Sequence, residues 1–62
     1  MDIGTQILID RRDAKLTQAE VAKHVHGLSR ATLIDIETRK VVPTKATSDA
    51  IFLAIKMLRQ PK

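Results

Sequence analysis

Hydrophobic residues recur along this chain at the spacing of short helices. Ile3, Ile7 and Ala14 follow a near-helical period, with arginines between them, and predict a first amphipathic helix over about residues 3–13. No segment alternates hydrophobic and polar residues over the length of a strand. The pattern therefore predicts an all-α fold, a compact bundle of four to five short helices.

Start and stop signals divide the middle of the chain into two further helices. Thr17 and Glu20 have the spacing of a capping box, in which each side chain accepts a hydrogen bond from the other residue's backbone amide. Gly27 can take the left-handed conformation that ends a helix, and Ser29 is a suitable N-cap for the next one. The inward residues expected on these two helices are Val21, Ala22 and Val25, then Leu33 and Ile36.

The last predicted helix is hydrophobic on nearly every side. Pro43 ends the preceding region, residues 44–48 are expected to form a polar connection, and Thr47 or Ser48 is expected to cap a helix over about 48–59. A helix that is hydrophobic on all sides is normally buried on all sides, and one small domain cannot cover every side of it. The core face expected is Ile51, Ala54, Ile55 and Leu58. The residues expected at a homodimer interface are Phe52, Leu53 and Met57.

Length and composition limit the classes of protein. The 62 residues allow one domain, 1–62, with a thin core, and the 0 cysteines exclude disulfides. The longest hydrophobic run, residues 50–55, is far shorter than the roughly 20 residues of a membrane-spanning helix. No secretory signal is expected, and we expect a cytoplasmic protein without a membrane partner. The 11 Lys+Arg against 7 Asp+Glu give a charge of +4, which fits either a polyanion partner or simple solubility.

Residues capable of catalysis or metal binding do not form a set with the required spacing. His24 and His26 are two residues apart, which places them on different faces of a helix, and no third metal ligand is evident. Two pairs of carboxylates lie close together in the sequence, Asp10 with Asp13 and Asp35 with Glu37. They are expected to form ion pairs with basic residues and not to act as an acid–base pair. We therefore expect no enzyme, no cofactor and no metal.

Three segments carry a resemblance to a known family. Residues 17–22 (TQAEVA), 27–33 (GLSRATL) and 36–37 (IE) together resemble the Cro/phage-repressor (XRE) helix-turn-helix family. The resemblance implies a lambda-repressor-like DNA-binding domain whose helix-turn-helix covers about residues 17–38. It implies a sequence-specific, double-stranded DNA-binding transcriptional regulator, in which the second helix of the unit enters the major groove.

The resemblance also implies residue roles. Gln18, Arg30, Ala31 and Asp35 would face DNA, and Arg11 and Glu37 would form a partly buried structural ion pair. From residue chemistry, Arg30 suits a guanine, and Asp35 suits either a cytosine amino group or the orientation of an arginine such as Arg30 or Arg39. The full set of DNA-binding residues expected is Gln18, Ser29, Arg30, Ala31, Thr32, Asp35, Arg39, Lys40 and Lys45.

Three departures from the family pattern have structural consequences. The turn is one residue longer than usual, most simply by His26, so that it either bulges or lengthens the helix before it by part of a turn. Asp10 stands where the family usually has leucine, so that either Ile9 turns inward or Asp10 pairs with a nearby basic residue. The glycine that often follows the Ile-Glu segment is replaced in Thr38–Lys40, so that helix end must close without it.

Two functions from different classes follow from these features. The first is a small dimeric Cro-like repressor, bacterial or phage-encoded, that occludes a promoter by binding a near-palindromic operator, with no effector domain in the chain. The alternative is an antitoxin or other protein-binding module that uses the hydrophobic last helix to bind a toxin. A protein of this family can combine both roles.

Overall fold

The described part of the chain folds into four α-helices. The computed structural model describes residues 2–59, and its helices are α1 (Ile3–Asp13), α2 (Gln18–His24), α3 (Arg30–Glu37) and α4 (Lys45–Leu58). No strand occurs in residues 2–59, so the all-α prediction is confirmed, with the lower of the two expected helix numbers. The Cα radius of gyration is 10.4 Å, close to the value of about 10.5 Å expected for a folded chain of this length.

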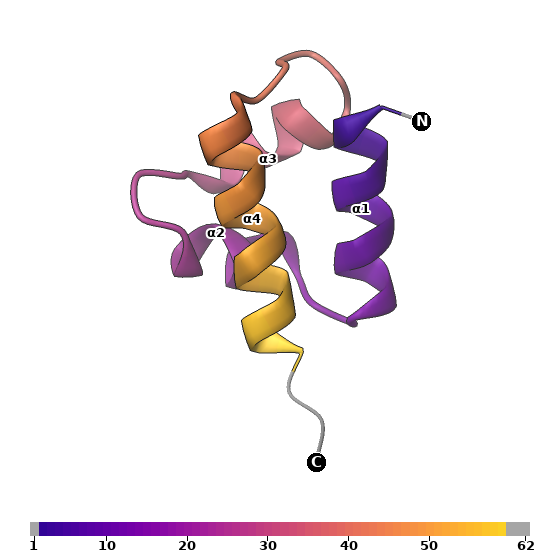
Figure 1. The fold of residues 1–62 in the computed structure, drawn as a ribbon, viewed down its shortest axis with the longest axis vertical. Helices are drawn as coiled ribbons and strands as arrows, with labels where there is room; N and C mark the ends of the chain where they lie inside the picture. The colour runs from indigo at the N-terminus through magenta and orange to yellow at the C-terminus, as the bar shows by residue number, and fades with distance from the viewer. Residues whose placement is uncertain (1, 60–62) are drawn as a thin grey trace.

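The helices enclose one hydrophobic core. α1 and α4 lie side by side and run in the same direction, while α2 and α3 pack against each other beside them (Figure 1). α1 also contacts α3, and α2 also contacts α4. Every helix contributes at least one fully buried side chain; these are Ile7, Val21, Leu33, Ile36 and Ile51. None of the helices in residues 2–59 has the length and hydrophobicity needed to cross a membrane.

The predicted starts of α2 and α3 are confirmed. The Glu20 amide donates to Thr17 Oγ1 at 3.1 Å, and the Thr17 amide donates to Glu20 Oε1 at 2.7 Å, which completes the capping box. Ser29 Oγ accepts from the Thr32 amide at 3.1 Å as the N-cap of α3. The first helix likewise has the bounds that its hydrophobic spacing predicts.

The predicted start of the last helix is wrong. Thr44, not Thr47 or Ser48, is the N-cap of α4, and its Oγ1 accepts from the Thr47 amide at 3.1 Å. Ser48 is buried inside the helix, where its hydroxyl donates to the Lys45 carbonyl. Thr44 directly follows Pro43 and has the same capping chemistry, so the polar residues expected to be a connection form the first turn of α4.

The turn between α2 and α3 contains His26, and α2 ends before it. α2 ends at His24, and Val25 already has an extended backbone (φ −105°, ψ 116°). Gly27 has φ +82°, the left-handed conformation predicted for it. His26 therefore lies in the turn, and α2 is not lengthened by it.

The two interpretations of Asp10 are both wrong. Ile9 stays 37% exposed and does not turn inward. Asp10 Oδ1 accepts a hydrogen bond from Gln6 Nε2 at 2.9 Å, so its partner is an amide one helical turn earlier and not a basic residue.

Two helices end with a left-handed residue that is not glycine. Lys15 after α1 has φ +60°, and Arg39 after α3 has φ +68°. At the end of α3 the Arg39 amide donates to the Ile36 carbonyl and the Lys40 amide donates to the Asp35 carbonyl, at 3.1 and 2.8 Å. This is the bond pair of a Schellman motif, with arginine where glycine is usual. The end of α3 thus closes without glycine, as its sequence requires.

Candidate nucleic-acid interface

α3 combines a fully buried face with an exposed first turn. Leu33 and Ile36 are 0% and 1% exposed and belong to the hydrophobic core. The residues at the start of the helix are all exposed; these are Ser29, Arg30, Ala31 and Thr32. The structure therefore brings four of the predicted DNA-binding residues together on one continuous surface.

The polar groups of this turn differ in whether they are already bonded. Ser29 Oγ and Thr32 Oγ1 lie 2.9 Å apart and share a hydrogen bond, in addition to the capping bond. Arg30 forms no hydrogen bond or ion pair within residues 2–59. Its guanidinium has five N–H donors, and all of them remain available to an external acceptor.

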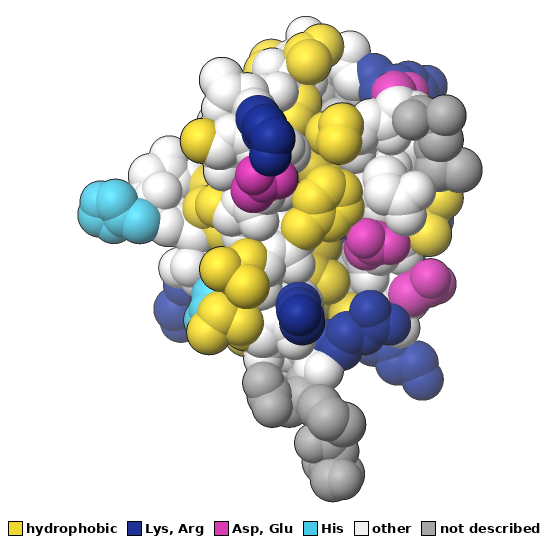
Figure 2. All heavy atoms as spheres, in the orientation of Figure 1, with side chains coloured by type: hydrophobic (Ala, Val, Ile, Leu, Met, Phe, Trp, Pro, Cys, Tyr) yellow, Lys and Arg dark blue, Asp and Glu magenta, His cyan; other side chains and the backbone are white. Residues whose placement is uncertain are grey.

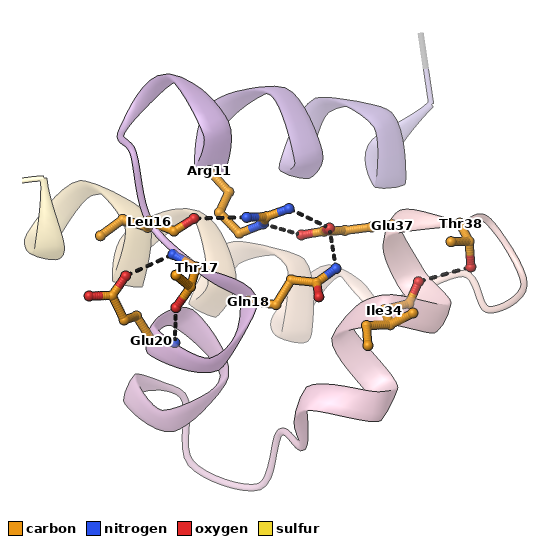
Figure 3. A network of polar contacts seen from close by, with 8 residues as sticks. All are labelled: Arg11, Leu16, Thr17, Gln18, Glu20, Ile34, Glu37 and Thr38. Atoms are coloured by element: carbon orange, nitrogen blue, oxygen red, sulfur yellow. Dashed lines mark hydrogen bonds and ion pairs between the residues drawn. The ribbon is translucent and has the colours of Figure 1, made fainter.

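The C-terminal end of α3 is fixed by a buried ion pair (Figure 3). Arg11 Nε and Nη2 donate to the two carboxylate oxygens of Glu37 at 2.7 and 3.0 Å, and the side chains are 11% and 2% exposed. Arg11 Nη1 also donates to the Leu16 carbonyl at 2.8 Å. The predicted ion pair is therefore present, and it ties α1 and the loop after it to the last residue of α3. A two-bond pairing of this kind restrains both distance and angle.

Gln18 extends this ion pair to α2. Its Nε2 donates to Glu37 Oε1 at 3.1 Å, and the residue is half-buried. A primary amide carries two N–H donors, so one of them remains for another acceptor. The predicted DNA contact of Gln18 stays a prediction, and the structure adds a second role, which is to hold α2 against the end of α3.

Asp35 lies one turn after Ala31 and is half-buried. Its carboxylate forms no ion pair with Arg30, Arg39 or any other group in residues 2–59. Of the two predicted roles, the orientation of an arginine is thus not seen. Its carboxylate, without a partner among the described residues, lies beside the exposed first turn of α3 and can accept hydrogen bonds from another molecule.

The three basic residues after α3 are differently placed. The Arg39 side chain points toward the start of α1. Its Nε lies 3.8 Å from Asp2 Oδ2, and its Nη1 donates a hydrogen bond to Thr5 Oγ1 at 3.3 Å. Lys45 forms an exposed ion pair with Asp49 at 2.9 Å. Lys40 is exposed and has no ion pair within the described residues. Of Arg39, Lys40 and Lys45, only Lys40 has no ion-pair partner within the described residues.

Asp2 caps α1 and, among the described residues, is the one ionisable group whose pKa is clearly shifted. The Thr5 amide donates to Asp2 Oδ1 at 2.8 Å. This hydrogen bond, with a smaller contribution from the Arg39 guanidinium, lowers the pKa of Asp2 below its ordinary value. Thr5 lies in the first turn of α1, and Arg39 directly follows the C-cap of α3. The lowered pKa of Asp2 therefore reflects contacts that hold the fold together.

The residues predicted at a dimer interface divide into two groups. Phe52 is half-buried and packs against the hydrophobic core, while Leu53 and Met57 are 56% and 50% exposed. His24, His26 and these two α4 residues line a hollow of about 300 Å³ between α2 and α4. Within residues 2–59 no three His, Cys, Asp or Glu side chains come together as a metal site.

Gly4 has a structural role that the sequence analysis did not identify. A Cβ atom at Gly4 would collide with the Ile36 carbonyl oxygen, so the start of α1 touches the backbone of α3 directly. A glycine inside a predicted helix is the available signal, since it costs helix stability and therefore indicates a close approach. This contact and the Arg11–Glu37 pair fix α3 against α1 at two points.

The chain matches no protein-family model, no curated protein and no solved structure. The family resemblance therefore rests on the sequence segments alone, and the function rests on what the exposed turn of α3 can do.

Proposed function

We propose that this protein is a sequence-specific, double-stranded DNA-binding transcriptional regulator, a small dimeric Cro-like repressor in which α2 and α3 act as a helix-turn-helix. The observation that carries the proposal is the state of α3. Its first turn is exposed, and Arg30 in that turn has no hydrogen bond or ion pair to any other described residue. Its C-terminal end is held by a buried ion pair to α1 and by the Gln18 amide of α2. A helix that reads bases needs both an accessible N-terminal turn and a fixed orientation.

Base recognition would use the first two turns of α3. An α-helix with side chains is about 10–12 Å across, which matches a major groove about 12 Å wide. Arg30 would donate two hydrogen bonds to guanine O6 and N7, and the methyl groups of Ala31 and Thr32 would contact thymine. Asp35, one turn further on, would accept a hydrogen bond from the amino group of cytosine, because its carboxylate has no ion-pair partner in the part of the chain that the structure describes.

Phosphate contacts would come from the residues around this helix. Within the described residues 2–59, Lys40 has no ion-pair partner, Lys45 has one exposed ion pair to exchange, and Gln18 keeps one N–H donor unused. Contacts of this kind orient a protein on the duplex without reading sequence, and they release counterions. Binding is therefore expected to weaken steeply with salt.

Repression would follow from occupancy of the operator. A two-fold dimer places two α3 helices on successive major grooves, about 34 Å apart, and so binds a near-palindromic site. A promoter overlapping that site is blocked while the dimer is bound.

The test is selection of bound duplexes from a random-sequence pool, followed by affinity measurements at two salt concentrations. We expect an enriched near-palindrome. Arg30→Ala should lose the preference at one base pair per half-site, worth about 1–3 kcal/mol. Lys40→Ala should weaken binding to all duplexes equally and reduce the salt slope by about one.

The control removes one positive charge elsewhere. Lys23→Ala changes an exposed lysine of α2 that has no part in the proposed interface, and it should leave the enriched sequence and the affinity nearly unchanged. Equal, salt-sensitive binding to every duplex, with no enriched sequence, would overturn the proposal.

A further inference from the structure

The outer face of α4 carries hydrophobic side chains between two opposite charges. Figure 2 shows hydrophobic surface over the C-terminal half of α4, with acidic and basic side chains along the same helix. Leu53 is the most exposed large hydrophobic residue of α4, at 56%, and Met57 beside it is 50% exposed. Asp49 lies four residues before Leu53 and Lys56 lies three residues after it, and both are exposed.

These charges are complementary to a second copy of the same helix. Asp49 and Lys56 lie about 6 Å and 4.5 Å from Leu53 along the helix axis, in opposite directions, at 1.5 Å per residue. Both lie on the same side of Leu53 around the helix, because their positions differ by seven residues, or about two turns. Lys56 forms no ion pair within residues 2–59, and the partner of Asp49 is the highly exposed Lys45.

We infer that the outer face of α4 is the homodimer interface, in which two α4 helices pair antiparallel about a two-fold axis at Leu53. In that arrangement each Leu53 meets the other copy's Leu53. Asp49 of each copy then lies within about 1.5 Å, along the axis, of the level of the other copy's Lys56. Two-fold symmetry forms this ion pair twice. In a parallel pair the same groups would be separated by about 10 Å along the axis.

Another hydrophobic surface of the molecule lacks this complementarity. Ile3, Val41 and Val42 are exposed around a hollow of about 250 Å³ near the start of α1. The charged residues of that hollow, Asp2 and Arg39, already pair with each other. On the α4 face, in contrast, Lys56 has no ion-pair partner within residues 2–59, and in an antiparallel pair it would lie level with Asp49 of the second copy. This complementarity favours a second copy of the chain over an unrelated protein.

This inference rests on the proposed function only for the expectation of a dimer, and its test uses no DNA. The first measurement is sedimentation equilibrium of the protein and of two matched variants. Leu53→Gln should give a monomer at concentrations at which the unmodified protein is a dimer. Val42→Gln, which changes a residue that is 87% exposed in the other hydrophobic surface, should leave the dimer unchanged. A monomeric unmodified protein, or dissociation by Val42→Gln and not by Leu53→Gln, would overturn the inference.

The second measurement tests the antiparallel register by charge exchange. Asp49→Lys and Lys56→Glu should each weaken self-association about tenfold or more, because each replaces two attractive pairs by two repulsive ones. An equal mixture of the two variants should form a mixed dimer at least as tight as the unmodified one, because every pair across the axis is then attractive. Lys45→Ala is the control, since it removes the partner of Asp49 inside the chain and should leave the dimer intact.

Charge variants that associate as tightly as the unmodified protein, or a mixture that forms no mixed dimer, would exclude this register. Failure of the proposed function is recognised separately. A protein that shows the expected pattern of mixed dimers but binds no preferred DNA sequence would retain the α4 interface and lose the assignment as a regulator.

Discussion

The junction between α1 and α3 and the inner face of α4 are held by different kinds of contact. At the junction, Arg11 and Glu37 form two hydrogen bonds, Gln18 adds a third, and Gly4 touches the α3 backbone. α4 instead buries Ile51, Ala54 and Ile55, with no buried polar partner except Ser48. Hydrogen-bonded ion pairs depend on direction, whereas hydrophobic burial does not. The junction therefore orients α3, whereas the inner face of α4 chiefly stabilises the fold.

The largest expected effect is at the junction. Glu37→Ala leaves the Arg11 guanidinium buried without its carboxylate, which typically costs about 3–5 kcal/mol. A core of this size rarely supplies more than about that amount, so we expect the variant to be largely unfolded at 25 °C. Urea denaturation followed by circular dichroism measures the change.

The control for this variant replaces both members of the pair. Arg11→Met with Glu37→Leu removes both buried charges, and replacement of a buried ion pair by hydrophobic residues is often close to neutral. The double variant should therefore be more stable than Glu37→Ala. If Glu37→Ala lost less than about 1 kcal/mol, the ion pair would not be what holds α3.

The second prediction concerns the backbone contact of the junction. Gly4→Ala places a methyl group against the Ile36 carbonyl oxygen, and strain of this kind costs about 1–3 kcal/mol. Helix propensity alone predicts the opposite sign, because alanine stabilises a helix by up to about 1 kcal/mol over glycine. The thermal unfolding midpoint decides between them, and an increase would show that α1 and α3 are free to separate.

The third prediction concerns the inner face of α4. Ile51→Val removes one methyl group from a fully buried side chain and should cost about 0.5–1.5 kcal/mol. Because α4 is expected to stabilise the fold without orienting α3, the DNA sequence selected by this variant should be that of the unmodified protein. A changed base preference would break the distinction between the two regions.

The fourth prediction uses a left-handed residue outside both regions. Lys15 has φ +60°, a conformation that costs residues with a Cβ atom about 1–2 kcal/mol. Lys15→Gly should therefore stabilise the fold by about 1 kcal/mol, measured by urea denaturation, after allowance for the flexibility of glycine in the unfolded chain. Lys15→Ala keeps the Cβ atom and should show no such gain; an equal gain would assign the effect to the lost charge.

The smallest effect is a pH dependence at the start of α1. The lowered pKa of Asp2 means that its contribution to stability is present above its ordinary pKa and is lost as the pH falls through the lowered value. Asp2→Asn keeps a capping side chain but not the charge. The difference in unfolding free energy between the two proteins should therefore shrink on acidification. A difference that stays constant as the pH falls well below the ordinary pKa of an aspartate would contradict the lowered pKa.

Local signals accounted for most of the fold. The capping box at Thr17, the N-cap at Ser29 and the left-handed Gly27 depend on neighbouring residues alone, and the structure contains all three. The start of α4 was mispredicted because Thr44, Thr47 and Ser48 offer the same capping chemistry, and the choice among them depends on packing.

Contacts between distant residues were harder to predict. The Arg11–Glu37 pair followed from the family resemblance, since residues 26 positions apart carry no local signal of contact. The close approach of Gly4 to Ile36 and the turn of Arg39 toward Asp2 were not predicted, because both require the relative placement of α1 and α3. For the candidate site, the sequence identified the exposed turn of α3 but not which of its groups are already bonded.

The most direct test of the division between the α3 and α4 surfaces is nuclear magnetic resonance of the backbone amides. Addition of a selected duplex should shift the amides of residues 29–32 and Lys40 most strongly. Dilution of the free protein should instead shift those of residues 49–57. We expect these two sets of shifted amides to be separate. Duplex-induced shifts concentrated on residues 49–57, with little change at residues 29–32, would contradict it.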